Sequence, residues 1–106
     1  MAESPYQLNA SSRSNVTQIV AYTGSAAGTT AGFSDKTFHI RVVSSSASHY
    51  KIGASGVAAT TSDPFLPANW YEYVRVNPGE FVSFIRASTN GLVTATSGSA
   101  TVTELT

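Results

Sequence analysis

The fold is indicated most directly by residues 70–87, which read WYEYVRVNPGEFVSFIRA. Two runs rich in aromatic and β-branched residues, which are typical of strands, flank the tetrapeptide Asn77-Pro78-Gly79-Glu80. Proline at the second position and glycine at the third are the residues that a type II turn favours. We therefore expect strands over residues 70–76 and 81–87, separated by a tight turn.

Both of these runs carry large apolar side chains on each of their two faces. A strand with one solvated face should alternate between apolar and polar residues, whereas a strand covered on both sides need not. The second face can be covered by loops of the same chain or by a neighbouring subunit, and the sequence leaves both alternatives open. Aromatic residues are enriched at interfaces. The residues that we expect at a subunit interface are Tyr71, Tyr73, Val82 and Phe84.

Outward from this stretch, strand signals recur at intervals of roughly ten residues, as in sandwiches and barrels. Residues 37–43 alternate cleanly, so Phe38, Ile40 and Val42 are expected to face inward and Thr37 outward. No window shows sustained helical periodicity. Further strands are expected over residues 16–22, 49–52, 57–61, 92–96 and 100–105, with a hairpin turn at Asn90-Gly91. The pattern predicts an all-β, single-domain antiparallel β-sandwich over residues 15–106.

Residues 1–14 show no periodic apolar pattern and are expected to form an extended N-terminal arm. Tyr6 and Leu8 are its large apolar side chains. Because they lie two residues apart, both would point to the same side of an extended segment and could anchor it on a surface.

Composition limits the classes of partner. The chain has 106 residues, six basic and six acidic side chains, no net charge and no cysteine. Six basic side chains are too few to form the basic face that neutralises many phosphates. We therefore expect neither nucleic acid nor a membrane as partner. The absence of cysteine excludes disulfides and thiolate metal sites. A nearly uncharged surface suits a protein that is packed against other proteins.

No pattern in the chain predicts catalysis, a metal or a cofactor. His39 and His49 fall on outward positions of neighbouring predicted strands and could approach each other, but no third ligand is placed by spacing. Glu72 and Glu80 flank the predicted turn and could lie on paired strands, but so small a domain has little room for a water-excluding cleft. We therefore expect a binding protein and not an enzyme.

Sugar binding is a second possible role, because exposed aromatic rings can stack on sugar rings. Trp70, Tyr71 and Tyr73 are the candidate residues. The competing interpretation, which we favour, places Trp70 in the core and the two tyrosines in packing at an interface or an edge.

The C-terminal part of the chain carries a series of short motifs. They are Leu66-Pro67-Ala68, Glu72-Tyr73, Val76-Asn77-Pro78-Gly79-Glu80, Ile85-Arg86-Ala87-Ser88, Leu92-Val93-Thr94 and Val102-Thr103-Glu104-Leu105. In this order they resemble small virion proteins of tailed bacteriophages, and most of all capsid cement, or decoration, proteins. The resemblance covers residues 38–106.

The resemblance implies a jelly-roll-like sandwich that forms a homotrimer on the outer surface of the capsid. There it would bind and bridge subunits of the major capsid protein and so stabilise the phage head. The arm would bind the capsid, with Tyr6, Leu8 and Arg13 as its contact residues. A carbohydrate-binding adhesin on the virion surface, and a head–tail or tail component, are the alternatives.

Overall fold

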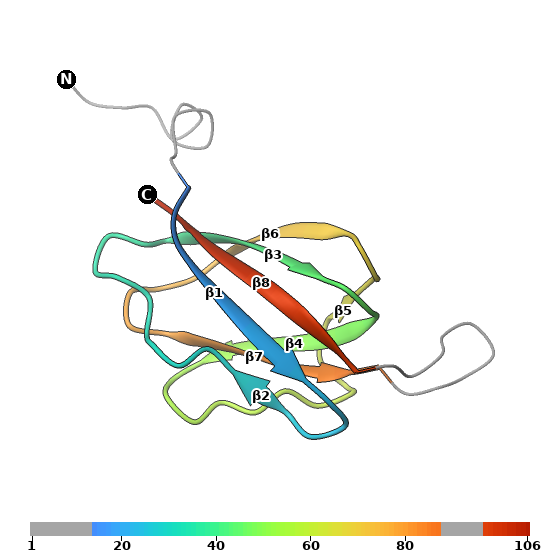
Figure 1. The fold of residues 1–106 in the computed structure, drawn as a ribbon. Coiled ribbons are helices and arrows are strands. Elements are labelled where there is room, and N and C mark those ends of the chain that lie inside the picture. The colour runs from blue at the N-terminus through green and yellow to red at the C-terminus, as the bar shows by residue number, and fades with distance from the viewer. Residues whose placement is uncertain (1–13, 88–96) are drawn as a thin grey trace.

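The computed structural model describes residues 14–87 and 97–106, and within them the chain forms eight strands and no helix (Figure 1). The strands are β1 (Ser14–Tyr22), β2 (Ala27–Gly28), β3 (His39–Ser44), β4 (Ser48–Gly53), β5 (Phe65–Leu66), β6 (Tyr71–Arg75), β7 (Phe81–Arg86) and β8 (Gly98–Leu105). Every pairing between them is antiparallel. The prediction of an all-β chain is confirmed.

The strands form two four-stranded sheets that pack face to face. The first sheet has the order β1-β8-β3-β6 and the second the order β2-β7-β4-β5. Figure 1 shows them as two layers, with β8 in the middle of the first and β7 and β4 in the middle of the second. Among the described strands, β4 and β5 are the only neighbours in the chain that also pair. The predicted antiparallel β-sandwich is therefore confirmed, and most connections cross from one sheet to the other.

The core lies between the sheets and is built from alternate residues of each strand. In β3 the buried residues are Ile40, Val42 and Ser44, and in β7 Val82 and Phe84 point into the same space. Burying one large apolar side chain stabilises a fold by about 1.5–3 kcal/mol, so this cluster is the main source of stability. Its buried members are Val20, Tyr22, Phe33, Ile40, Val42, Leu66, Val76, Val82, Phe84, Ala100 and Val102.

The predicted alternation over residues 37–43 fails at its start. Ile40 and Val42 are fully buried as expected, but Phe38 is 43% exposed and Thr37 is completely buried. The strand begins only at His39, because a turn precedes it in which the Thr37 amide donates to the Ser34 carbonyl at 3.1 Å. The turn directs Thr37 inward and leaves Phe38 partly exposed. The outward assignment of Thr37 and the inward assignment of Phe38 were therefore both wrong.

The turn between β6 and β7 has the predicted form but a different role. The Glu80 amide donates to the Asn77 carbonyl at 3.2 Å, and Gly79 has a φ of 81°, as a type II turn requires. The turn joins β6 in the first sheet to β7 in the second, so the flanking strands do not pair with each other. The hairpin predicted at Asn90-Gly91 and the strand predicted over residues 92–96 lie outside the described residues.

The outer face of the second sheet is covered by the chain itself. The expected strand over residues 57–61 is absent, and this segment belongs to the long loop between β4 and β5. The Ala59 amide donates to Ser83 Oγ at 3.0 Å, and neither residue is more than 3% exposed. For β7, therefore, a loop of the same chain accounts for the apolar residues on both faces.

The side chain of Glu104 in β8 holds the turn before β3 by hydrogen bonds, and substitutions of this residue test their contribution to stability. Its side chain is 3% exposed, and Oε1 accepts hydrogen bonds from the Ser34 amide at 3.0 Å and from the Thr37 hydroxyl at 2.5 Å. Glu104→Ala should lower the free energy of unfolding by about 1–3 kcal/mol, because two donors lose their acceptor. Denaturant unfolding measures this change. Glu104→Gln, which keeps an acceptor oxygen, should lose less; equal losses in both variants would contradict this account.

Candidate functional site

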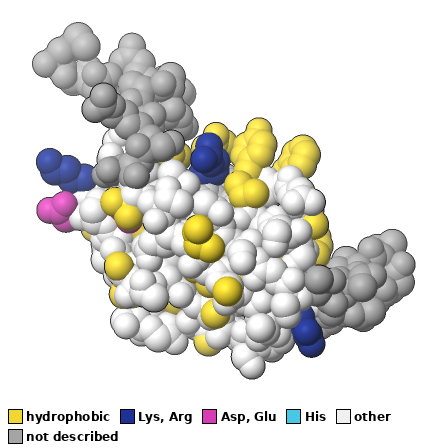
Figure 2. Space-filling view, viewed as in Figure 1, with side chains coloured by type: hydrophobic (Ala, Val, Ile, Leu, Met, Phe, Trp, Pro, Cys, Tyr) yellow, Lys and Arg dark blue, Asp and Glu magenta, His cyan; other side chains and the backbone are white. Residues whose placement is uncertain are grey.

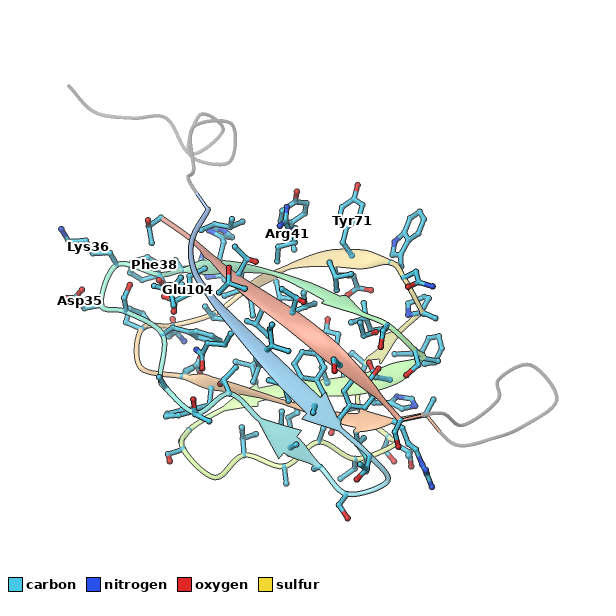
Figure 3. All side chains as sticks on the ribbon, viewed as in Figure 1. Asp35, Lys36, Phe38, Arg41, Tyr71 and Glu104 are labelled. Carbon is cyan, nitrogen blue, oxygen red and sulfur yellow. The ribbon has the colours of Figure 1, made fainter. Side chains whose placement is uncertain are left out.

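The outer face of the first sheet brings together four side chains from β3 and β6. Arg41 lies opposite Tyr73, and Val43 opposite Tyr71, in the antiparallel register of the two strands. Because Ile40 and Val42 face the core, the residues that alternate with them face outward. The four residues Arg41, Val43, Tyr71 and Tyr73 line an open pocket of about 170 Å³. Figure 3 shows Arg41 and Tyr71 projecting to the same side of this sheet.

Two aromatic contacts that share Tyr71 build this face. Trp70 stacks on Tyr71 with ring centroids 5.8 Å apart, and Tyr71 meets Tyr73 edge-on at 5.6 Å. Their side chains are 58%, 51% and 61% exposed, respectively. Figure 2 shows hydrophobic side chains projecting from the rim of the molecule beside a basic one. We call Arg41, Val43, Trp70, Tyr71 and Tyr73 the aromatic face.

The position of Trp70 corrects the interpretation that placed it in the core. The preceding residue, Asn69, has a φ of 58°, which turns the chain just before β6 begins at Tyr71. Trp70 therefore lies outside the strand alternation and stacks on the solvent side of Tyr71. The two tyrosines are on the outside, as expected.

The charged groups on this side of the sheet are basic. Strand alternation directs His39, Arg41 and Arg75 outward, whereas Glu72 in β6 and Glu104 in β8 point toward the second sheet. Arg41 makes no ion pair with any described residue. No described residue therefore prevents its guanidinium from pairing with an acidic group of a ligand or partner.

Val82 and Phe84 do not belong to this site. Both side chains are completely buried, and the Phe84 ring lies 6.2 Å from that of Tyr22 and 6.5 Å from that of Tyr50. A side chain enclosed in the core cannot touch a second subunit, so their assignment to a subunit interface is corrected. The sequence showed that β7 is apolar on both faces but not which face would be inside.

The two histidines lie in different sheets, His39 in β3 and His49 in β4. His49 Nδ1 is hydrogen-bonded to the Asp63 carbonyl oxygen at 2.8 Å, and its ring packs edge-on against Phe65. Within residues 14–87 and 97–106, no three His, Asp or Glu side chains gather closely enough to hold a metal ion. In the same residues, no helix has the length and hydropathy that a membrane span needs.

The remaining predicted site residues, Tyr6, Leu8 and Arg13, lie outside the described residues. β1 begins at Ser14, the last residue that the sequence assigned to the arm.

The two acidic residues beside the turn are also separated. Glu72 is in β6 of the first sheet, and Glu80 precedes β7 of the second, where its Oε1 accepts a hydrogen bond from the Asn77 amide at 2.7 Å. The idea that they lie on paired strands was wrong, because the turn between them crosses the sandwich.

Glu72 instead makes a contact that the sequence analysis missed. It accepts a hydrogen bond from the Tyr50 hydroxyl at 2.9 Å, which links β6 of the first sheet to β4 of the second. This bond fixes β6 from its inner side, while Tyr71 and Tyr73 point outward. The sequence predicts that Tyr50 faces inward, but only the packing of the two sheets brings Glu72 to its hydroxyl group.

Comparisons with known proteins found no match: no protein-family model, no curated protein and no solved structure matches this chain. The site is therefore interpreted from its own geometry. This face has flat exposed rings, a small open pocket and a guanidinium without an ion pair among the described residues, all features that suit binding.

The link between Tyr50 and Glu72 predicts a dependence on alkaline pH. Burial, the hydrogen bond to Glu72 and the charge of Glu72 raise the pKa of Tyr50 from 10.0 to about 12. A pKa raised on folding adds stability that is fully present below pH 10 and is lost as the pH rises through about 12. Titration of tyrosinate absorbance should contain a late step near pH 12 that belongs to Tyr50. Glu72→Gln should lower that pKa and Tyr50→Phe should remove the late step; a late step that persists in Tyr50→Phe would contradict the assignment.

Proposed function

We propose that this chain is a structural virion protein, a capsid cement or decoration protein that binds the outer surface of a phage head. The observation that carries the proposal is the aromatic face, on which Trp70, Tyr71 and Tyr73 are each more than half exposed. Such a face leaves apolar surface uncovered, and another surface is expected to cover it.

The chemistry of the face suits a protein partner. Trp, Tyr and Arg are the residue types that dominate binding energy at protein interfaces. The chain as a whole has no net charge, so attraction over long distances contributes little. We infer a partner surface on the major capsid protein that offers apolar groups around an acidic one, which Arg41 would pair.

Two further observations support the assignment. The motifs in residues 66–105 resemble those of small phage virion proteins. The strands pair as nested partners, β1 with β8, β2 with β7, β3 with β6 and β4 with β5, which is the arrangement that a jelly roll gives. Jelly rolls occur in viral capsids and in lectins, so the architecture favours the proposal without deciding it.

Attachment to empty shells tests the aromatic face. Trp70→Ala and Tyr73→Ala should each weaken attachment roughly tenfold or more, because truncating an interface anchor typically costs 1–3 kcal/mol or above. Co-sedimentation of the purified variants with shells measures the loss. Phe65→Ala is the matched control, because Phe65 is an exposed aromatic residue on the second sheet. Loss of attachment in the control alone would contradict the role of the aromatic face.

The predicted arm gives a separate test. Removal of residues 1–13 stops before β1, so the sandwich should still unfold cooperatively, while attachment to shells should fall. Equal attachment by the truncated and full-length chains would contradict the expected role of Tyr6, Leu8 and Arg13. Copy number separates the virion roles: hundreds per particle indicate the shell, and about a dozen indicate a head–tail or tail component.

Carbohydrate binding remains the second candidate function. The specific observation in its favour is the pocket lined by Tyr71, Tyr73 and Arg41, whose guanidinium pairs with no acidic side chain of residues 14–87 or 97–106. A sugar ring could stack on an exposed aromatic ring while Arg41 pairs a carboxylate. Glycan-array binding that is lost in Trp70→Ala or Tyr73→Ala, without any attachment to shells, would favour this function over capsid binding.

A further inference from the structure

The two sheets have four outer edges, and three of them are unsuited to pairing with another chain. β2 and β5, the edges of the second sheet, are two residues long each. β1, at one edge of the first sheet, has an irregular register between Ser14 and Thr17, and in its regular part the Gln18 side chain bonds the backbone of loop residues Thr30 and Ala31. Short strands and bulges are devices by which natural proteins keep sheet edges from associating.

β6 is the exception. It is the other edge of the first sheet, and its five residues pair with β3 in an unbroken register. It contains neither proline nor lysine, the residues that commonly protect such an edge. Its two charged residues are Glu72, whose carboxylate is already bonded to the Tyr50 hydroxyl, and Arg75 at its last position. Among the described strands longer than two residues at a sheet edge, β6 is therefore the one whose register is regular along its whole length.

The hydrogen bonds of β6 show which of its backbone groups are unused. The Val76 amide donates to the Phe38 carbonyl at 2.9 Å, so the backbone groups of Val76 point toward β3. Because these groups alternate in direction along an antiparallel strand, those of Val74 and Glu72 point the same way. The amides and carbonyls of Tyr71, Tyr73 and Arg75 consequently point away from β3, to the free edge.

We propose that β6 pairs antiparallel with β6 of a second copy of this chain, about a two-fold axis at Tyr73. The two copies then share one continuous sheet of eight strands, four from each. This inference goes beyond the proposed function, because the dimer forms in solution without a shell.

The register of this pairing is self-complementary. With the axis at Tyr73, the free backbone groups of Tyr73 meet those of Tyr73 in the second copy. Tyr71 lies opposite Arg75 of the second copy, and both side chains are on the outer face, where a guanidinium can rest on a tyrosine ring. The two-fold axis creates this contact twice. The pairing leaves Glu72 in its hydrogen bond with Tyr50, because Glu72 faces the other side of the strand.

The dimer also extends the aromatic face. Two copies of Trp70, Tyr71 and Tyr73 would lie on one side of the shared sheet, with the pockets at Arg41 repeated across the axis. Two linked copies of a weak binding surface attach to a repeating lattice more tightly than one. The symmetry differs from the homotrimer that the resemblance to decoration proteins implies, so the oligomeric state decides between them.

Single-cysteine cross-linking tests the register, since the chain contains no cysteine of its own. Directly opposed residues of a hydrogen-bonded antiparallel pair have Cα atoms about 5.5 Å apart, within reach of a disulfide. Mild oxidation of full-length Tyr73→Cys should therefore give a covalent dimer. Ile19→Cys is the matched control, because Ile19 is 73% exposed on β1, at the other edge of the same sheet. Cross-linking of Tyr73→Cys no faster than that of Ile19→Cys would overturn the inference.

Analytical ultracentrifugation of the unmodified chain supplies the second measurement. We expect a monomer–dimer equilibrium, and Arg75→Glu should raise its dissociation constant roughly tenfold by removing two cation–π contacts. Circular dichroism should show that this variant, altered at an exposed position, keeps its fold. A monomer at high concentration, or a trimer, overturns the inference. A dimer that fails to attach to shells leaves the inference standing and counts against the proposed function instead.

Discussion

β8 lies between β1 and β3, and the register of these pairings determines where the strand residues of the aromatic face lie. On its inner side Val102 is completely buried in the core, and on its outer side Thr103 lies between Thr17 and Arg41. β3 carries the same register on to β6, so that Arg41 meets Tyr73. A slip of one residue at β8 would exchange the inner and outer faces of a strand and bury a guanidinium. The aromatic face thus depends on a strand that contributes no residue to it.

The two outer faces of the sandwich differ in how far other parts of the chain cover them. On the second sheet, the loop between β4 and β5 covers Ser83 and closes the face by intrachain contacts. On the first sheet the rings beside β6 remain uncovered among the described residues. The uncovered face carries tryptophan, tyrosine and arginine, the residue types that dominate binding at protein interfaces. This asymmetry, more than any single residue, indicates which side of the molecule is used.

Local pattern predicted the longer described strands but not the two-residue strands β2 and β5, and the strand expected over residues 57–61 is absent. It could not predict which strands are neighbours in a sheet. The alternation of Ile40 and Val42, and the turn at Gly79, follow from rules that act over a few residues, and both were predicted. Val82 and Phe84 were misassigned because a strand that is apolar on both sides does not reveal which side is inside. Trp70 was misplaced because the left-handed backbone at Asn69 has no strong local signature. The bond from Tyr50 to Glu72 depends on how two distant strands are stacked, which a strand-by-strand analysis does not contain.

The nested strand order also shapes how the chain reaches its native state. Only β4 and β5, among the described strands, pair with a neighbour in sequence, whereas Ser14 lies opposite Leu105. Closing so large a loop costs conformational entropy before the contacts it forms can offset that cost, and β-sandwiches dominated by such contacts fold over roughly milliseconds to seconds. During that interval apolar strands of the unfinished sheets stay open to other nascent chains. Folding therefore competes with aggregation, and the competition becomes more severe as the concentration of unfolded chains rises.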